Sequence, residues 1–523
     1  MSQKWVWWEA CLALLLVFVG QIALLEDIYS ETYDEHAHIS EALIWLESGS
    51  YLVDGFQSPL PRLAFAMGPR MAGYDSSLPW FSQDYAEQDP TSYERSLWLA
   101  RLGTLPFAFL MFGTVALWSR HLLGTGPSLA ALTLLTFEPT VVGHSALATL
   151  DVPGAAGYLI AMVAFWNWMR RPSYASAALA GAGLGFAQMC KFSAFGFAVV
   201  PFIFVFYCLV SRLRIRAVLP QLVTFAVMCF VVIWASYGFD IGEIHSYRHD
   251  QMASTPAELA IGTRLQGVTA PAPRFWTGFV DMTYLQQQGH PAFLLGEASE
   301  TGWWLYFPVT LLLKATPSLL ILSIWGGVAA FRKPRSSALM LIVFAAAGIL
   351  LVSLSSRVDI GVRHLAPMFP LLAILGGSVF LHLRLRSVAG LLALGLIGWQ
   401  VAESLAVFPD DIAYFTPGFR AKDYHYLSDS NLAWGQDRKR LVQWRIDHPD
   451  RDVYVWRAED NGPWQVAGLE NGSADAEWLI LDTTMVAILL ANENEGELET
   501  LVQSPPAERI GRSILIYRWH PAR

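Results

Sequence analysis

Long apolar runs dominate this 523-residue sequence and decide what it can fold into. Only 15% of the residues are charged, against about a quarter in a typical soluble domain. A helix needs roughly 20 mostly apolar residues to cross about 30 Å of hydrocarbon. The runs that meet this requirement lie near residues 5–25, 98–118, 126–147, 152–169, 174–190, 193–211, 218–238, 304–330, 337–355, 365–382 and 388–408. The sequence therefore predicts an α-helical polytopic membrane protein with about 11 transmembrane helices.

Composition and cysteine placement exclude several other classes of protein. A net charge of −9 gives no reason to expect a nucleic acid as partner. Four cysteines are present, and all of them fall in apolar stretches: Cys11, Cys190, Cys208 and Cys229. The polar segments thus have no thiol for a disulfide framework or a cysteine metal site. We also find no internal repeat, no P-loop and no glycine-rich nucleotide fingerprint.

Short basic connections predict the orientation in the membrane. Cytoplasmic connections carry an excess of Lys and Arg, and alternate connections here hold Lys4, Arg120, Arg170, Arg171, Arg212, Arg214, Arg216, Arg332, Lys333, Arg335, Arg384 and Arg386. The N-terminus is then cytoplasmic, with the first span as a retained anchor. Two large loops, 26–97 and 239–303, the short segment 356–364 and the tail after 409 are expected on the outer side, which is the periplasm in a bacterial inner membrane.

The tail has the composition of an ordinary soluble protein. Residues 452–457, 478–482 and 514–519 have the patterns of short strands, and residues 437–446 and the stretch from 485 have those of helices. We therefore expect a transmembrane domain over 1–408 and a small extracytoplasmic α/β domain over 409–523. Within the first of these, the spacing of Gly181 and Gly185 fits tight helix packing.

The first loop opens with a dense group of titratable side chains at Asp34, Glu35, His36 and His38. A solvated acidic loop is the simplest interpretation. A carboxylate here could also take a proton from an acceptor hydroxyl as a new bond forms. Oxygen and nitrogen ligands suit Zn²⁺ or Mn²⁺, although this spacing matches no standard metal motif.

Two further ionisable residues lie at the ends of predicted spans. Asp151 comes just before a span, where a charge needs a wet cavity or a partner, or else serves as a helix N-cap followed by Pro153. Lys191 is flanked by apolar residues and lies on the predicted outer side, where the positive-inside rule disfavours a basic residue. Its side chain therefore either snorkels to headgroups or binds a lipid phosphate. His144 and Glu138 nearby are interpreted as structural.

A second basic cluster on the predicted outer side consists of Arg357, Arg363 and His364. Guanidinium groups bind phosphate through a bidentate fork, so an anionic headgroup would explain basic residues on this face. Acidic and basic groups then converge at one edge of the bundle, close to the hydrocarbon. A substrate with an apolar tail and a phosphate head would fit there, with a carboxylate to activate a second substrate.

Six short motifs, in order along the chain, resemble those of lipid-carrier-dependent glycosyltransferases with the multispanning GT-C fold. The similarity is greatest to the bacterial relatives of protein O-mannosyltransferases, the dolichyl-phosphate-mannose-protein mannosyltransferase-like group, with aminoarabinose transferases as more distant relatives. The motifs are Asp34-Glu35-His36-Ala37-His38, Thr149-Leu150-Asp151-Val152-Pro153, Cys190-Lys191-Phe192-Ser193, Trp303-Trp304-Leu305-Tyr306-Phe307-Pro308, Ile360-Gly361-Val362-Arg363-His364 and the segment from Asp429 to Asp437.

Three departures from the family pattern concern the acceptor more than the reaction. His36 replaces a proline after the acidic pair, Ser58-Pro59-Leu60-Pro61 stands where relatives tend to have His-Pro-Pro-Leu, and Ala433 replaces an aspartate. The first two border the acceptor side of the expected cavity.

The resemblance implies an enzyme that moves a sugar, of the hexosyl or mannosyl type, from a polyprenyl phosphate to an acceptor hydroxyl with inversion. It implies Asp34 as general base, Glu35 orienting it or sharing its proton, and Asp151 as a second acidic group. The phosphate-binding residues would be Lys191, Arg363, His364 and Arg357. The residues that could cap the cavity, or simply cap a helix, are Asp429, Asn431, Gln436 and Asp437. No obligatory metal is implied, with a divalent cation kept as an alternative.

The rival from another class is a membrane transporter or lipid flippase without transfer chemistry. Transporters place paired ionisable groups near the bilayer midplane and often have duplicated halves, whereas the candidate groups here lie at loop edges. The resemblance leaves the sugar open, and it leaves the acceptor open among protein, glycolipid and polysaccharide. It favours a multi-pass protein of a bacterial inner membrane.

Overall fold

The computed structural model describes residues 3–49, 51, 57–76, 90–246, 264–332, 337–381, 383–455, 476–491 and 497–519. Parts of both predicted large loops, residues 52–56, 77–89 and 247–263, lie outside the described residues. The end of the strand predicted at 452–457 also lies outside them.

Every predicted apolar stretch forms helix. In chain order these helices are α1 (Gln3–Ile28), α6 (Leu105–Leu123), α7 (Thr125–Thr136), α8 (Pro139–Ser145), α9 (Asp151–Arg170), α10 (Tyr174–Cys190), α11 (Ala194–Arg212), α12 (Ile215–Ser236), α16 (Tyr306–Lys314), α17 (Pro317–Arg332), α18 (Ser337–Ser353), α19 (Met368–Ser378) and α20 (Val388–Val407). Among the described residues, 5 helices are long and apolar enough to span a membrane, or 6 if the bent pair α16–α17 is one span.

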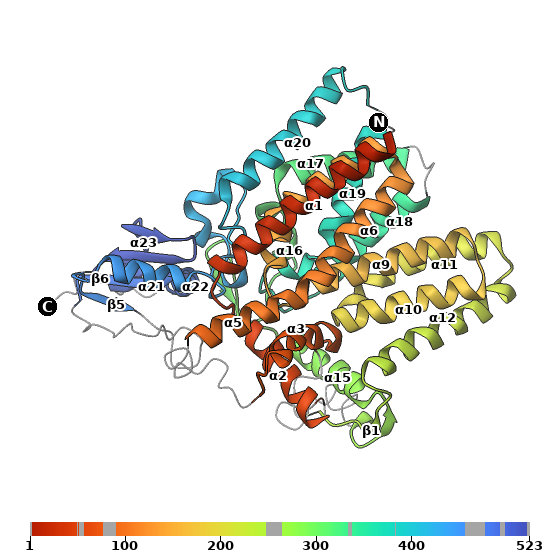
Figure 1. The fold of residues 1–523 in the computed structure, drawn as a ribbon, viewed down its shortest axis with the longest axis horizontal. Coiled ribbons are helices and arrows are strands. Elements are labelled where there is room, and N and C mark those ends of the chain that lie inside the picture. Colours follow the sequence, from red (N-terminus) through yellow and green to blue (C-terminus); the bar gives the residue numbers. More distant parts are fainter. Residues whose placement is uncertain are drawn as a thin grey trace.

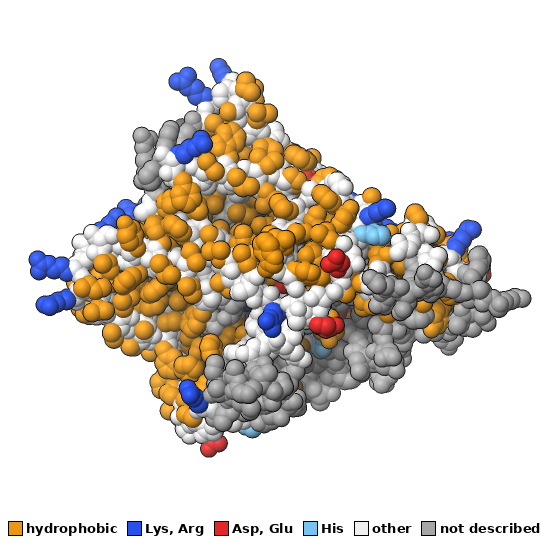
Figure 2. Space-filling view, turned by 180° about the vertical axis from the view of Figure 1, so that it is seen from behind, with side chains coloured by type: hydrophobic (Ala, Val, Ile, Leu, Met, Phe, Trp, Pro, Cys, Tyr) orange, Lys and Arg blue, Asp and Glu red, His pale blue; other side chains and the backbone are white. Residues whose placement is uncertain are grey.

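The surface supports a membrane environment for this bundle. Figure 2 shows hydrophobic side chains over most of one face, with Lys and Arg side chains at its projecting ends. Exposed aliphatic residues recur along α12 and α20, for example Val223, Val227, Leu391 and Leu392. Because exposed apolar area on this scale is unfavourable in water, the prediction of a polytopic membrane protein is confirmed. The count of about 11 spans stays a prediction.

Small residues allow close packing between α10 and α12, which run side by side with α9 and α11 in Figure 1. A Cβ atom on Gly181 would lie 2.0 Å from the carbonyl oxygen of Phe225, and one on Gly185 would lie 2.6 Å from that of Cys229. Any larger residue would have to push the helices apart. The expectation of tight packing at these two glycines is therefore confirmed.

Two predicted spans, 126–147 and 304–330, are broken rather than continuous. Glu138 is extended (φ −93°, ψ 109°) between α7 and α8, and α16 and α17 meet at 115°. A proline follows each break, at Pro139 and Pro317, and proline disfavours helical geometry in the residue before it. The two breaks face each other, because Thr316 Oγ1 donates to Glu138 Oε2 at 2.7 Å.

The connections predicted as loops contain helices and hairpins of their own. The first holds α2 (Glu35–Ser48), α3 (Pro59–Met71) and α5 (Pro90–Arg101), which pack through Ile39, Leu43, Phe65 and Leu97. The second holds α15 (Pro273–Gln288) and two antiparallel hairpins, β1 (Ile241–Glu243) with β2 (Thr269–Pro271) and β3 (Ala292–Leu294) with β4 (Glu297–Ser299).

The C-terminal region, meaning the residues after 408, contains a small mixed sheet at one end of the molecule (Figure 1). Its strand order is β5 (Val453–Val455), β6 (Trp478–Asp482), β8 (Ile514–Arg518) and β7 (Glu508–Ile510), with β5 and β6 parallel. The helices are α21 (Arg438–Asp447), α22 (Thr483–Ala491) and α23 (Glu497–Gln503), preceded by the 3₁₀ turns η4 (Pro417–His425) and η5 (Asp429–Asn431). The predicted strands and helices are thus confirmed, while β7 and α23 were not predicted.

The close approach of α10 to α12 gives a testable consequence. We expect Gly181→Ala to destabilise the protein by about 1–3 kcal/mol, as overpacking of a filled interior does. Gly113 in α6 is the matched control, because a Cβ atom there has nothing within 4 Å; Gly113→Ala should be neutral or slightly stabilising. Thermal unfolding of both variants in detergent measures the difference, and equal melting temperatures would contradict this packing.

Candidate active site

Asp34 and Arg363 form an ion pair although 329 positions separate them in the sequence. Asp34 directly precedes α2, but its carboxylate makes no capping hydrogen bond and turns to Arg363 instead. Arg363 lies in the 3₁₀ turn η2 (Val362–Leu365), just before α19. The Asp34 side chain is 24% exposed and that of Arg363 10%, so the pair remains accessible from a cavity.

Two groups besides Asp34 hold the guanidinium of Arg363. Its Nε donates to Ser430 Oγ at 3.0 Å, and the guanidinium carbon lies 4.3 Å from the centre of the Trp434 ring. Burial alone would lower the pKa of Arg363, but Asp34, Asp151 and Asp429 outweigh it and raise that pKa above its usual value. Arg363 is therefore a fixed positive charge at the centre of an acidic group.

Asp151 and Lys191 form a second pair beside the first. Lys191 Nζ donates to Asp151 Oδ1 at 2.5 Å, and Thr149 Oγ1 donates to Asp151 Oδ2 at 3.1 Å. Neither simple alternative fits this geometry. The N-cap of α9 is Leu150, and the Lys191 ammonium turns inward rather than toward headgroups. A glycine at position 154 makes room for it, because a Cβ atom there would lie 2.7 Å from that of Lys191.

The two pairs belong to one cluster. Lys191 Nζ lies 3.4 Å from the carbonyl oxygen of Arg363, so all four predicted residues meet. His364 lies next to them, packed on Phe307 with ring centres 6.1 Å apart. Burial, reinforced by Lys191 and Arg363, lowers the pKa of His364 well below its usual value. A neutral imidazole at this position can hydrogen-bond to a substrate but adds no positive charge for a phosphate.

Glu35 has a structural environment, although the sequence grouped it with the catalytic carboxylates. Its side chain is fully buried, and each carboxylate oxygen accepts a hydrogen bond from Arg101, at 2.9 Å in both cases. The backbone N–H groups of Thr32 and Ala148 each donate to one of the oxygens at 2.8 Å. Burial disfavours the charged form, but Arg101 and these hydrogen bonds outweigh it and lower the pKa of Glu35. Glu35 is thus a positioning residue.

Arg357 lies apart from the cluster. Its side chain is exposed, and its Nη1 donates to the carbonyl oxygen of Gln287 at 3.1 Å, in the last turn of α15. Sequence proximity to Arg363 therefore does not bring it to the ion pairs. The residues that sequence reasoning did not assign to the site are Ser430, Trp434 and His290. Ser430 and Trp434 lie inside a motif that was recognised, whereas His290 had no signal in the sequence.

Of the four residues expected to cap the cavity, only Asp429 lines it. Asn431 is buried and accepts from the backbone N–H of Val362 at 3.0 Å, which fixes the Arg363 turn. Gln436 Oε1 accepts from the Trp434 backbone N–H at 2.8 Å, and Asp437 Oδ2 accepts from Ser513 Oγ at 2.7 Å in the turn before β8. These three residues stabilise contacts within the C-terminal region and with the Arg363 turn, and they do not line the cavity.

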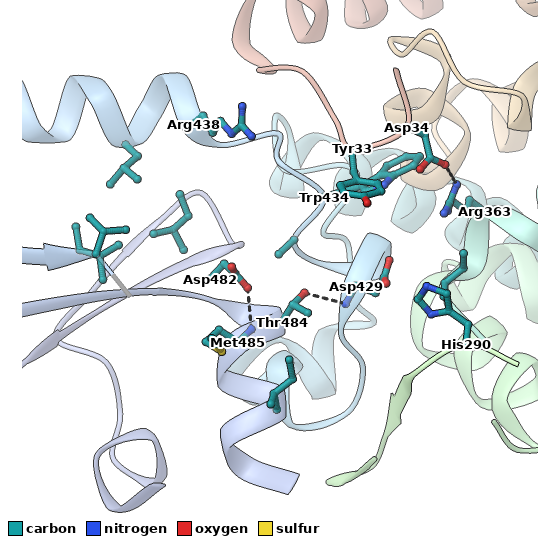
Figure 3. A pocket seen from close by; sticks show the side chains of 17 residues that line it. Tyr33, Asp34, His290, Arg363, Asp429, Trp434, Arg438, Asp482, Thr484 and Met485 are labelled. Carbon is teal, nitrogen blue, oxygen red and sulfur yellow. Dashed lines mark hydrogen bonds and ion pairs between the residues drawn. The ribbon is translucent and has the colours of Figure 1, made fainter. Parts of the chain in front are cut away.

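A cavity of about 350 Å³ opens beside the Asp34–Arg363 pair, which is within the usual size of a small-molecule site. Figure 3 shows Asp34, Tyr33, Trp434 and Arg363 on one side of it and Asp482, Thr484 and Met485 of the C-terminal region on the other. The cavity thus joins both large loops and the C-terminal region at the same place.

The side chains considered for metal binding do not converge. His38 Nδ1 accepts from Arg62 Nε at 3.2 Å, and His36 Nδ1 lies 3.7 Å from Glu31 Oε1. In the part of the chain that the structure describes, no group of three or more His, Cys, Asp and Glu side chains could hold a metal ion. The expectation that no metal is obligatory stays a prediction.

A match to a known family explains this arrangement. Residues 12–246 match the sequence profile described as dolichyl-phosphate-mannose-protein mannosyltransferase. The match covers a little under half of the chain and includes Asp34, Asp151 and Lys191. Residues 12–246 are thus similar to a family of membrane glycosyltransferases. This match confirms the resemblance of the motifs within residues 12–246, and the family described is one of enzymes rather than of transporters or flippases.

Similarity to solved structures extends to the fold. ArnT from Cupriavidus metallidurans bound to undecaprenyl phosphate is 16% identical, with 81% of this chain and 68% of that chain covered and a TM-score of 0.51. This similarity supports a GT-C-like fold and nothing finer. Among curated proteins, none matches the chain.

Two other solved structures match less closely. The Saccharomyces cerevisiae protein O-mannosyltransferase Pmt1–Pmt2 complex bound to the sugar donor is 14% identical over 45% of this chain and 33% of that chain, with a TM-score of 0.36. The Archaeoglobus fulgidus oligosaccharyltransferase is 13% identical over 91% and 70%, with a TM-score of 0.45.

Glu35 is held in a buried ion pair with Arg101, and this structural environment distinguishes it from its neighbour Asp34. We expect Glu35→Gln to destabilise the glycosyltransferase by about 3–5 kcal/mol, because it leaves a buried guanidinium without its counter-charge. Thermal unfolding in detergent and the yield of monodisperse protein measure the loss. The double variant Glu35→Gln, Arg101→Met should recover part of that stability; no recovery would mean that the ion pair is not the cause.

Proposed function

We propose that this glycosyltransferase moves a sugar from a polyprenyl-phosphate donor to an acceptor hydroxyl, with Asp34 as general base and with inversion at the sugar. The observation that carries the proposal is the Asp34–Arg363 pair at the wall of a cavity, with Asp151 and Lys191 beside it. A carboxylate and two cations within one cluster match the two needs of the reaction, which are a proton acceptor and a site for the leaving phosphate.

In the proposed reaction, the acceptor hydroxyl oxygen attacks the anomeric carbon of the sugar. The hydroxyl proton passes to the Asp34 carboxylate as the new C–O bond forms. The bond between the anomeric carbon and the phosphate oxygen breaks, and its electron pair leaves on the lipid phosphate. Because one displacement takes place on one carbon, the configuration inverts.

Binding of the donor phosphate would change the partner of Arg363. In the ion pair, Asp34 is engaged with the guanidinium and is a poor proton acceptor. A phosphate is a bidentate partner for Arg363, and its arrival would free the Asp34 carboxylate for the acceptor. Lys191 would exchange Asp151 for the phosphate in the same way, and Asp151 would then help to position Asp34 or the acceptor.

We further propose the predicted topology of about 11 spans with a cytoplasmic N-terminus and the C-terminal region outside, in the periplasm of a bacterial cell. The helices formed by every apolar stretch and the basic ends of α11 and α17, at Arg212 and Arg332, support it. The cluster would then lie at the outer edge of the membrane, where a lipid-linked phosphate is accessible. The family description names a dolichyl-phosphate-mannose donor and a protein acceptor, while the sugar and the acceptor of this chain are left to experiment.

Asp34→Asn tests the general base. The amide cannot take the proton, so we expect transfer to fall by at least about 10²–10⁴-fold, the usual contribution of general-base catalysis. The measurement is release of polyprenyl phosphate from a radiolabelled polyprenyl-phosphate sugar by the enzyme in nanodiscs. Because Asp34 is 24% exposed, thermal unfolding should change little. Activity that remained near that of the wild type would remove Asp34 from the mechanism.

Lys191→Ala tests the phosphate site. Loss of a hydrogen bond to a charged group costs about 1.5–3 kcal/mol, so donor affinity should fall about 10- to 100-fold in a titration with polyprenyl phosphate. Lys439→Ala is the matched control, since Lys439 also pairs with a carboxylate, that of Glu94, at 2.5 Å but lies away from the cavity. Equal donor affinity in the two variants would mean that Lys191 does not bind the donor phosphate.

A further inference from the structure

The wall of the cavity opposite Asp34 is aliphatic and belongs entirely to the C-terminal region. Its side chains come from five elements: Leu441 of α21, Val455 of β5, Ile480 of β6, Ile514 of β8, and Met485 and Ile488 of α22. Most are buried, with Ile480 at 2% and Ile514 at 3% exposed, whereas Ile488 is 48% exposed. Leu441, Ile480 and Ile514 also belong to the small hydrophobic core of the C-terminal sheet, and their cavity-facing atoms together with the exposed Ile488 offer an apolar surface to an apolar group of a ligand.

The polar side chains of the cavity disfavour an anionic ligand at this wall. Three carboxylates line the cavity, Asp34, Asp429 and Asp482, against two guanidinium groups. Arg363 already pairs with Asp34, and Arg438 has Glu31 as its strongest opposite charge. Once the donor phosphate has replaced Asp34 on Arg363, a second anionic group at the aliphatic wall would face three carboxylates while both guanidinium groups are already engaged, so the acceptor group that fits there is uncharged.

His290 gives the polar end of the cavity a hydrogen-bond acceptor. Its Nδ1 lies 2.8 Å from the carbonyl oxygen of Pro291, and a carbonyl only accepts, so Nδ1 carries the proton in the neutral ring. The lone pair is then on Nε2, and His290 lines the cavity together with Asp34 and Asp429. Hydroxyl groups of a ligand would find acceptors at this end.

We propose that the C-terminal region forms an aliphatic subsite for the acceptor. The acceptor of this enzyme is uncharged near its reacting hydroxyl and carries a branched aliphatic group that packs against Ile480, Met485 and Ile488. The inference rests on the proposed function, because it places the reacting hydroxyl at Asp34. It adds the chemical class of the acceptor and a binding role for a region outside the membrane helices.

Two neutral glycosides test the subsite directly. The full-length protein in nanodiscs is titrated with methyl β-glucoside and with 3-methylbutyl β-glucoside, and binding is followed by saturation-transfer NMR with empty nanodiscs as the reference. The branched compound adds four carbons, and partial burial of these carbons against the wall should make it bind about 10- to 100-fold more tightly. Equal affinities of the two glycosides would overturn the proposal.

A charge placed on the wall should remove this preference. Ile488→Asp should reduce the affinity for 3-methylbutyl β-glucoside at least tenfold and leave that for the methyl glycoside unchanged. Ile446→Asp is the matched control, since Ile446 is 64% exposed on α21 and does not line the cavity. A preference that survived Ile488→Asp, or an equal loss in both variants, would also overturn the subsite.

The same titrations separate this proposal from the proposed function. If undecaprenyl phosphate competes with 3-methylbutyl β-glucoside for the Ile488 wall, the wall holds the lipid of the donor and the acceptor subsite is wrong. A branched-chain preference in a protein that transfers no sugar would uphold the subsite and contradict the function. Sugar transfer without that preference would contradict the subsite and uphold the proposed function.

Discussion

The arrangement of the site depends on one buried ion pair, between Glu35 and Arg101. Taking two charges out of water costs several kcal/mol per ion, and every polar contact around this pair offsets that cost. Arg101 also donates to the backbone carbonyls of Glu26, Tyr29 and Ser30. The chain between α1 and α2 is therefore wrapped around a single guanidinium group. This fixes the position from which Asp34 faces Arg363.

Two adjacent carboxylates consequently have opposite environments. Glu35 accepts five hydrogen bonds and has no exposure, and the lowered pKa keeps it ionised. Asp34 is partly exposed and has one strong partner, Arg363, which a phosphate can replace. A structural carboxylate must be fully satisfied, whereas a base must be able to exchange its partner. The local geometry meets these two requirements at adjacent positions of the sequence, the first at Glu35 and the second at Asp34.

The helices and the motif residues could be predicted from the sequence because both depend on local sequence pattern. Apolar runs predicted where helix forms, and the strand at 478–482 was predicted to the residue. Pairings that join distant segments had no local signal. The basic cluster by itself did not distinguish Arg363 from Arg357, although only Arg363 lies in the motif at 360–364. The contacts that hold Arg363 come from Ser430 and Trp434, which are distant in the sequence. The ion pair of Glu35 likewise had no signal in the sequence, because its partner Arg101 lies 66 positions away.

The segment from Asp429 to Asp437 connects both halves of the site to the C-terminal region. The backbone N–H groups of Ser30 and Tyr33 donate to the carbonyls of Gln436 and Trp434, at 2.9 and 3.0 Å. Asn431 holds Val362 on the other side, and Asp437 holds the turn before β8. The same nine residues therefore contact both the loop of Asp34 and the turn of Arg363. The relative position of Asp34 and Arg363 thus depends on a region outside the membrane helices, which also supplies the aliphatic wall of the cavity.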